Sequence, residues 1–590
     1  MTELSAREAA TMPACVSPRI GADGLIGAVL LEDGVGTLVA FREGAEHVLV
    51  SGLAGAREDS GILFDWDVSG IVWVDSTGAL QASPAEYPSD GRVLWAEGRA
   101  QYPTISPDGN WVVFVGETAT TCRVMVVPRE GVRSAVAVSD ADFAWDPTWS
   151  PSGDLAWHEW DSPGMPWGSS RIMVSACQES GIWGPATCVS DRGRWVAQPR
   201  FSRDGALGAL IENNGWLNLA TLRLGAAPVE VSPESFLVTA DAHEHGEPNW
   251  SSGQRSWAWD ANGGAVINAN LNGWSQLCRV VHGNEASAEI WSRGWHTQLD
   301  HRDGVTVALR SGARTPSQLV RYDVSGNANV LWRSLPDEEQ DREPSSVIWD
   351  RDGRRLHGLL WHPPKIRPVR GLIVQCHGGP TGASNVTYKN NPRFWTSRGW
   401  SVFQPNPSGS SGGGRELRVA LDGLWGQLDV DEVLEGTRLV YSQLDEPGLP
   451  IVSMGSSAGG MLALLLADRW SGRIAAVLTR CPVTDPRALA DGTSRFEMGY
   501  GSRMSGSQPP REAIPIEMVG ESRTPVFIAH GTADSVVSIE QSRAYTARAR
   551  AAGRTVELME CEGEGHSFSL TANKITELER SLVFVHHHAR

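Results

Sequence analysis

Residues 449–469 read LPIVSMGSSAGGMLALLLADR, and this stretch decides the fold expected of the C-terminal part of the chain. The short apolar run 451–454 predicts a buried strand, and the apolar run 461–467 predicts a helix. Between them, glycines stand two residues before and two residues after Ser457, which is the Gly-x-Ser-x-Gly pattern of a nucleophile elbow. The glycines let strand and helix approach closely, so we expect the Ser457 hydroxyl above the sheet at a helix N-terminus.

The elbow pattern alone is weak evidence because the chain contains 64 glycines, so partners further along the chain decide its meaning. Asp534 closes a His-Gly-x-x-Asp pattern just past a predicted strand, and His566 stands in a Gly-rich loop after the next one. The order Ser457, Asp534, His566 is the order expected for an α/β-hydrolase triad. In such a triad His566 takes the serine proton and Asp534 fixes the histidine tautomer. Asp485 and Asp491 remain as alternatives for the acid.

A glycine-rich loop follows the first long predicted strand of this region and reads His377-Gly378-Gly379-Pro380. Glycines allow backbone amides to approach a developing oxyanion. We therefore expect an oxyanion hole formed by His377, Gly378 and the amide of Ala458, with Gly379 and Pro380 contacting the substrate.

A second loop, 406–415, is rich in glycine and serine and could be a linker. The segment that begins at Trp425 suggests instead an ordered loop near the site, which makes Ser408 and Trp425 candidates for substrate binding.

Strands and helices alternate through the C-terminal part of the chain, which predicts a mostly parallel sheet covered by helices on both faces. A hairpin over 346–361 precedes them. The expected strands are 371–376, 401–404, 451–454, 475–478, 525–529 and 556–560, and the expected helices are 428–441, 461–470, 539–552 and 573–584.

A repeat organises the first part of the chain. The sequence PTISPDG at 103–109 recurs as PTWSPSG at 147–153 and PRFSRDG at 199–205, with degenerate copies at 18–24 and 248–253. A period near 40–50 residues with several short strands per repeat predicts the blades of a β-propeller, about seven of them between residues 15 and 335. A pair of β-sandwiches is the competing architecture, but it does not predict the repeat. We expect a β-propeller domain over 1–340 and an α/β-hydrolase domain over 341–590.

Length, charge and cysteine usage limit the classes of binding partner and the cellular location that we expect. At 590 residues the chain should form two large domains, and a net charge of -18 argues against nucleic acid and anionic membranes. Met1–Ala14 lacks the apolar core of a signal peptide, and no apolar stretch is long enough to span a bilayer. The eight cysteines are scattered, as is typical of reduced thiols, so we expect a cytoplasmic protein.

No cofactor or metal site is expected from the sequence. It contains no phosphate loop or dinucleotide fingerprint. We interpret His243-Glu244-His245 as part of a solvated loop.

A set of short motifs in the C-terminal part resembles the prolyl oligopeptidase family of serine peptidases, closest to its acylaminoacyl-peptidase and dipeptidyl-peptidase branch. The matching residues are 377–380, Asn406 with 409–410, 425–426 with Asp429, 455–460, 530–534 and 564–566. The resemblance covers nearly the whole chain. It implies a propeller capping an α/β-hydrolase domain with the active site in a cavity between them, and it leaves a homo-oligomer open.

Three residues at two places in the chain depart from the family pattern. The family usually has Tyr-Arg in the second loop where this chain has Pro407 and Ser408, and it often has an arginine two residues after the acid, where Val536 stands. Such an arginine helps to hold the substrate carbonyl in several members. Val536 therefore joins the candidate substrate-binding residues, and Arg415 or Arg503 could fill the vacant place.

Three functions follow from these observations. The first is a serine hydrolase that cleaves amide bonds of small peptides or acyl-peptides through an acyl-enzyme. The second is a hydrolase of a small non-peptide amide, ester or thioester in a biosynthetic pathway. The third is a propeller interaction module with a vestigial hydrolase domain, and the complete set Ser457, Asp534 and His566 argues against it.

Overall fold

The computed structural model describes residues 3–589 except 22, 33, 43–44, 55–61, 86–89, 132–133, 180, 191–192, 223, 225–238, 240, 261–262, 282–286, 337–342, 445–446 and 490–492. The chain divides into two compact units. One consists of Pro13–Leu271 and Ser275–Pro336, and the other of Met1–Met12, Asn272–Trp274 and Asp337–Arg590.

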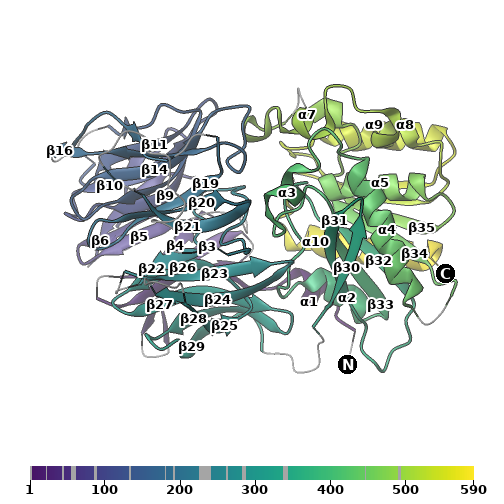
Figure 1. Cartoon of the computed structure of the whole chain (residues 1–590), viewed down its shortest axis with the longest axis horizontal. Helices are drawn as coiled ribbons and strands as arrows, with labels where there is room; N and C mark the ends of the chain where they lie inside the picture. The colour runs from purple at the N-terminus through teal and green to yellow at the C-terminus, as the bar shows by residue number, and fades with distance from the viewer. Residues whose placement is uncertain are drawn as a thin grey trace. The chain divides into compact units, whose positions relative to one another are not determined.

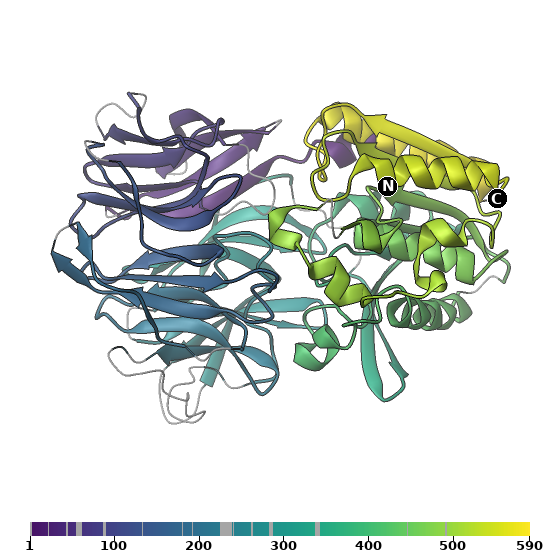
Figure 2. The same cartoon turned by 90° about the horizontal axis from the view of Figure 1, so that it is seen from above.

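The first unit is built from small antiparallel sheets (Figures 1 and 2). Two four-stranded sheets contain β1 (Ala14–Ile20), β2 (Ile26–Glu32), β3 (Val35–Arg42) and β4 (Ala45–Leu53), then β5 (Phe64–Asp67), β6 (Gly70–Val74), β7 (Leu80–Pro84) and β8 (Arg92–Trp95). Next along the chain come β9 (Arg99–Ile105), β10 (Trp111–Glu117), β11 (Cys122–Pro128), β12 (Val136–Ala137), β13 (Phe143–Trp149), β14 (Leu155–Trp160), β15 (Arg171–Ser175) and β18 (Thr187–Cys188). A separate hairpin consists of β16 (Cys177–Glu179) and β17 (Ile182–Trp183).

The remaining strands of this unit form three further sheets. They are β19 (Val196–Phe201), β20 (Leu207–Asn213) and β21 (Trp216–Leu222); β22 (Trp257–Trp259), β23 (Ala265–Leu271), β24 (Trp274–Val281) and β25 (Ser287–Arg293); and β26 (Trp295–Arg302), β27 (Val305–Gly312), β28 (Thr315–Tyr322) and β29 (Ala328–Arg333).

Apolar side chains join consecutive sheets, and they also join the first sheet to the last. Ile26 and Val39 of the first sheet share one buried cluster with Val307, Leu309 and Leu319 of the last sheet. This closure of a series of sheets onto itself is the defining feature of a β-propeller, so the predicted propeller is confirmed.

The repeated motif forms the turn between two consecutive antiparallel strands, β9 and β10, β13 and β14, or β19 and β20. Its glycines at 109, 153 and 205 have φ of 75°, 87° and 87°, a conformation that glycine adopts without steric cost. The number of blades stays a prediction. One parallel pairing, of β11 with β13, joins two groups of strands into a single eight-stranded sheet, and residues 225–238 lie outside the described part of the chain.

The second unit contains an eight-stranded sheet in the order β30-β31-β33-β32-β34-β35-β36-β37. From β33 onward neighbouring strands are parallel, and β30 and β31 form the antiparallel edge. The strands are β30 (Ser345–Arg351), β31 (Arg354–Trp361), β32 (Gly371–Cys376), β33 (Trp400–Asn406), β34 (Ile451–Ser456), β35 (Ile474–Arg480), β36 (Val526–Gly531) and β37 (Val556–Cys561). Every strand expected from the sequence in this region is present.

Helices pack on this sheet in two groups. The helix α1 (Ala6–Ala10) contacts α2 (Asn390–Thr396) and α10 (Thr571–His588), whereas α4 (Leu428–Ser442) contacts α5 (Ala458–Arg469), which contacts α8 (Pro515–Met518). The other helices are α3 (Gly414–Val419), α7 (Tyr500–Ser505), α9 (Ile539–Ala551) and the short η1 (Pro486–Ala488), η2 (Arg495–Glu497) and η3 (Arg511–Ala513). The four predicted helices correspond to α4, α5, α9 and α10.

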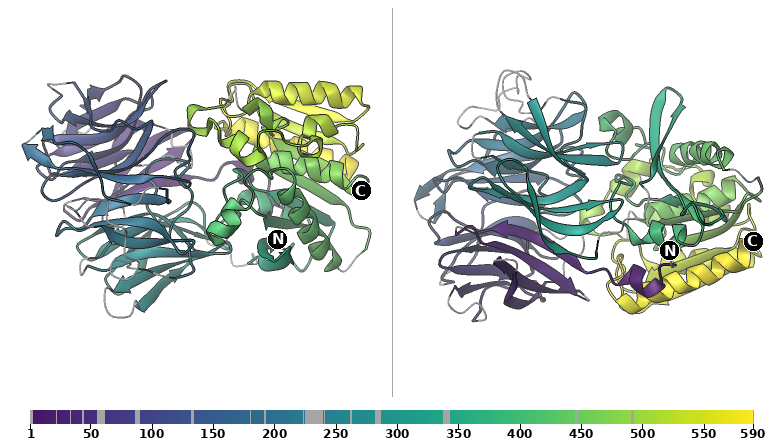
Figure 3. Two further views of the ribbon diagram at one scale, coloured as in Figure 1. Left: turned by 45° about the horizontal axis from the view of Figure 1, so that its top comes forward. Right: turned by 90° about the horizontal axis from the view of Figure 1, so that it is seen from below.

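The helix α1 belongs to the C-terminal unit, although the sequence-based division placed residues 1–340 together. Figure 3 shows α1 beside α10. The Asn390 amide donates to the carbonyl of Ala9 at 3.0 Å, and the amide of Leu4 donates to Ser397 Oγ at 3.2 Å. The expected boundary at 340/341 lies outside the described residues.

Other expectations can be compared with the structure directly. All eight cysteines are free. Glu244 and His245 are buried, so the interpretation of their segment as a solvated loop was wrong; His245 Nε2 lies 2.8 Å from Asp241 Oδ1, a bond that compensates for its burial. No helix in the described ranges is long and apolar enough to cross a membrane.

Candidate active site

Ser457 stands at the sharp turn between β34 and α5. Its backbone has φ 56° and ψ −124°, an unfavourable conformation for a residue with a side chain, and its amide donates to the carbonyl of Arg480 at 3.0 Å. A Cβ atom on Gly455 would collide with the carbonyl of Gly459, and one on Gly459 would collide with the carbonyl of Cys376. The turn therefore requires glycine on both sides of Ser457.

Asp534 and His566 form a hydrogen-bonded pair at the same edge of the sheet. They follow β36 and β37, whose carboxyl ends lie at the edge where β34 delivers Ser457. His566 Nδ1 lies 2.7 Å from Asp534 Oδ2. The other oxygen, Oδ1, accepts the amides of Val536 and Val537, each at 2.9 Å. The aspartate is thereby held in one orientation.

The charge of Asp534 is stabilised by its neighbours. Burial works against ionisation, but hydrogen bonds from His530 and His566 lower the pKa of Asp534 well below its usual range. The aspartate is therefore negatively charged at neutral pH, as a partner of a histidine base must be.

His530 is a supporting residue whose role the sequence did not indicate. It is fully buried, with Nδ1 2.7 Å from Ser542 Oγ and Nε2 2.9 Å from the carbonyl of Val537. Nε2 also lies 3.3 Å from Asp534 Oδ2. Its position four residues before the acid, within the His-Gly-x-x-Asp pattern, was the available signal.

Cys481 also lies beside this pair. The ligand atoms of Cys481, Asp534 and His566 fall within 4.8 Å of one another, which is close enough for a metal ion. Burial raises the pKa of the Cys481 thiol far above neutrality, so the thiol is protonated. We assign Asp534 and His566 to their mutual hydrogen bond and not to metal binding.

The predicted oxyanion loop leaves the sheet at the end of β32. A Cβ atom placed on Gly378 would lie 3.6 Å from Ser457 Cβ, so the backbone of this loop runs close to the serine. The two ring nitrogens of His377 are already hydrogen-bonded within the protein. Nδ1 lies 2.8 Å from the Gly378 carbonyl, and Nε2 lies 2.9 Å from Ser410 Oγ. Ala458 is the first residue of α5, where amides lack intrahelical partners.

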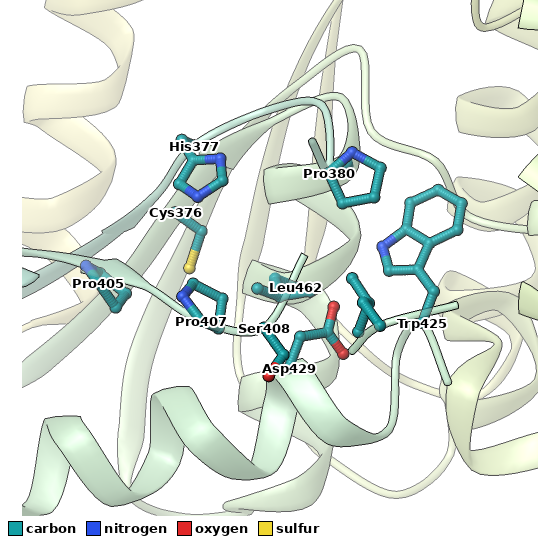
Figure 4. Close-up of a pocket in the computed structure, with 11 residues that line it drawn as sticks. Cys376, His377, Pro380, Pro405, Pro407, Ser408, Trp425, Asp429 and Leu462 are labelled. Atoms are coloured by element: carbon teal, nitrogen blue, oxygen red, sulfur yellow. The ribbon is translucent and has the colours of Figure 1, made fainter. Parts of the chain in front are cut away.

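A pocket behind this loop contains three of the candidate substrate-binding residues, Pro380, Ser408 and Trp425 (Figure 4). Ser408 is buried, and both its amide and its hydroxyl donate to Glu432, at 2.7 and 2.9 Å. Asp429 Oδ2 and Trp425 Nε1 are buried without a hydrogen-bond partner in the described part of the chain.

A second cavity, which we call the Ser457 recess, is lined in part by Ser457 itself. Its walls include Gly379, Trp425, Ser457 and Ala458, all expected near the site, together with Val537 and Glu497, which the sequence did not single out. Val536 is partly buried, and the adjacent Val537 lines the recess.

The arginines proposed to replace the family arginine lie as follows. Arg503 pairs with Asp422 at 2.8 Å, and Arg415 is an exposed residue of α3.

Of the two alternative acids, Asp485 accepts the amide of Arg487 and caps η1. Asp491 lies outside the described residues.

The sheet order, the strained serine after a central strand, and the aspartate–histidine pair after the next strands define the C-terminal unit as an α/β-hydrolase domain. Residues 386–590 match the model of the prolyl oligopeptidase family, so the chain carries a domain of that family.

Curated relatives align with parts of the chain. A peptidase of Bacillus subtilis, YuxL, is 24% identical over 242 residues, which cover 39% of this chain and 36% of that protein. The acylamino-acid-releasing enzyme of Rattus norvegicus is 23% identical over 228 residues, 37% of this chain and 31% of that protein. Dipeptidyl-peptidase 5 of Aspergillus oryzae is 31% identical over 386 residues, 61% of this chain and 46% of that protein. Each alignment thus spans less than half of the relative's length.

Solved structures resemble the chain over nearly its whole length. A puromycin-hydrolyzing peptidase of Mycobacterium tuberculosis has a TM-score of 0.89 and 23% identity, covering 100% of this chain and 96% of that chain. An acylaminoacyl peptidase of Pyrococcus horikoshii has a TM-score of 0.75 and 14% identity, covering 100% and 98%. At these identities the likeness establishes a shared fold.

Proposed function

We propose that the chain is a serine peptidase that cleaves amide bonds of small peptides or acyl-peptides. The observation that carries this proposal is the 2.7 Å hydrogen bond between His566 and Asp534, at the sheet edge where the elbow presents Ser457. The family domain and the peptidase relatives support the same reaction. Hydrolysis of a non-peptide amide, ester or thioester is the less favoured alternative.

The chemistry follows from the proposed roles. Ser457 Oγ attacks the substrate carbonyl while His566 accepts its proton, and Asp534 stabilises the resulting imidazolium. The amides of Gly378 and Ala458 would donate to the oxyanion, and each such donor contributes about 10²–10³ in rate in comparable enzymes. His566 then protonates the leaving amine, and a water activated by the same histidine hydrolyses the acyl-enzyme.

The proposal extends to finer features. It includes about seven blades, a domain division near residue 340, a cytoplasmic location, and a short peptide or small molecule as the ligand, with no nucleic-acid partner. It also keeps Gly379, Pro380, Ser408, Trp425 and Val536 as candidate substrate-binding residues. The burial of Ser408 against Glu432 favours an indirect contribution through the shape of the pocket.

A labelling and turnover experiment tests the reaction. The full-length chain is treated with a fluorophosphonate probe and then assayed with peptidyl p-nitroanilides, p-nitrophenyl esters and puromycin, since two similar structures are described as puromycin-hydrolysing. We expect the probe on Ser457 and amide turnover that is lost, by about 10⁶ in kcat, in Ser457→Ala. Labelling or ordinary turnover by that variant would overturn the assignment.

A further inference from the structure

The Ser457 recess contains an acidic side chain that the proposed mechanism does not use. Glu497, at the end of η2, lines the recess that Ser457 and Ala458 also line. Glu497 is partly buried, and within the described part of the chain its carboxylate has no hydrogen-bond donor and no ion-pair partner. A partly desolvated carboxylate without such a partner can accept a cationic group.

A second polar group of the recess is also unsatisfied. Thr493 Oγ1 is buried without a hydrogen-bond partner among the described residues, and Thr493 lines the same recess. The Tyr500 side chain is already engaged, because its hydroxyl donates to Thr381 Oγ1 at 2.6 Å and accepts the Thr381 amide at 3.0 Å. Trp425 Nε1, a donor, is also unsatisfied, whereas the Glu497 carboxylate accepts and the Thr493 hydroxyl can either accept or donate.

The charged groups near Glu497 are compatible with a bound cation. Burial raises the pKa of Glu497 to about 7, with His566 lowering it and Asp534 raising it. Arg503, on the neighbouring helix α7, is paired with Asp422. A bound cation would therefore supply the missing partner and favour the ionised form of the carboxylate.

The walls of the recess limit what that cation can be. Val483, Leu489 and Val537 make much of the wall apolar, and the recess is partly open to solvent. Such walls suit a cation that is carried on an organic group. An ammonium group matches the polar part, because it has three donors and no acceptor.

We propose that Glu497, assisted by Thr493, binds an ammonium group on the acyl half of the substrate, the half that becomes attached to Ser457. This inference rests on the proposed peptidase function and names its substrate class: amides whose scissile carbonyl belongs to a residue with a free amino group. That amino group has two sources, the α-amine of an amino-terminal residue or the ε-amine of a lysine. Since the recess is shared with the nucleophile, Glu497 is a specificity-determining residue.

The experiment compares charged and neutral acyl groups on the full-length chain. The substrates are alanyl-p-nitroanilide, its N-acetyl form, N-acetyl-lysyl-p-nitroanilide and p-nitrophenyl butyrate. We expect Glu497→Gln to lower kcat/KM for the amine-bearing anilides by tenfold to a hundredfold, the value of a charge-assisted hydrogen bond. Turnover of the butyrate ester and fluorophosphonate labelling should change less than about threefold. Glu512→Gln is the control, because Glu512 is exposed and does not line the recess, and it should change nothing.

Each outcome distinguishes the two proposals. A loss confined to alanyl-p-nitroanilide identifies an α-amine, and one confined to the lysyl substrate identifies an ε-amine. Equal kcat/KM of wild type and Glu497→Gln on both amine-bearing substrates, with labelling and ester turnover intact, would overturn the role of Glu497 alone. If the wild type is neither labelled by the probe nor able to hydrolyse any of the substrates, the peptidase function itself is overturned.

Discussion

Gly459 packs against the carbonyl oxygen of Cys376 so closely that no side-chain atom fits between them. Gly459 lies in the first turn of α5, and Cys376 ends β32, the strand beside β34. The contact holds the helix that begins after Ser457 directly against the strand that leads into the loop 377–380. The position of Ser457 relative to that loop therefore depends on the absence of a side chain at Gly459.

We expect Gly459→Ala to lower both stability and activity. The new methyl group meets backbone atoms of β32 and of His377, which cannot rotate away, so we expect a destabilisation of about 1–3 kcal/mol, as for overpacked cores. The measurement is the urea midpoint together with kcat. Gly520→Ala is the matched control, because a Cβ atom there meets no neighbour within 4 Å; equal effects of the two substitutions would contradict the explanation.

Asp534→Asn should lower kcat by about 10⁴ while leaving the fold intact, because an amide cannot hold His566 in the required tautomer. Steady-state kinetics and thermal unfolding measure the two effects. Asp485→Asn provides the comparison, since Asp485 only caps η1 and binds Arg487, and it should keep kcat within about threefold. A large loss of kcat in Asp485→Asn together with a nearly unchanged kcat in Asp534→Asn would identify Asp485 as the partner of His566.

Val536→Arg should improve the turnover of acylated dipeptidyl anilides by about tenfold or more, the value of one charge-assisted hydrogen bond. Val536 follows Asp534 by two residues, its amide is fixed by Asp534 Oδ1, and Arg503 is occupied by Asp422. The readout is kcat/KM for peptide anilides relative to p-nitrophenyl butyrate. Unchanged values for both would show that another group already holds the substrate carbonyl.

Asp429 should make stability depend on pH. Burial raises its pKa to about 8, above the ordinary value near 3.9, so between about pH 4 and 8 the folded state holds a proton that the unfolded state has released. The contribution of Asp429 to the free energy of unfolding therefore falls as pH rises through this range. Asp429→Asn removes this dependence, so its stability relative to wild type should be higher at pH 8 than at pH 5 in urea unfolding. Parallel curves for the two proteins would contradict the protonated state.

The sequence predicted those parts of the C-terminal unit that depend on local patterns. Strands such as β34 and β36 are short apolar runs, and Asp534 and His566 come directly after strands, so chain order alone suggested the triad. Glu497 was missed because the segment between β35 and β36 forms short helical turns without an apolar period. Its closeness to Ser457 arises only from tertiary packing.

Long-range packing also explains the difference at α1. Five residues with a capping box between Ser5 and Glu8 predict at most a short helix, and nothing local indicates where that helix docks. Its contacts with Asn390 and α10 join segments at opposite ends of the sequence.

The docking of α1 has a consequence for the order of events during synthesis. This helix leaves the ribosome before every strand of the propeller, yet the surfaces of α2 and α10 that receive it are translated only after the propeller is finished. The emerging α1 must remain without its partners throughout that interval. A helix translated before the propeller thus docks only after α2 and α10 have been made, and its docking marks the completion of the C-terminal unit.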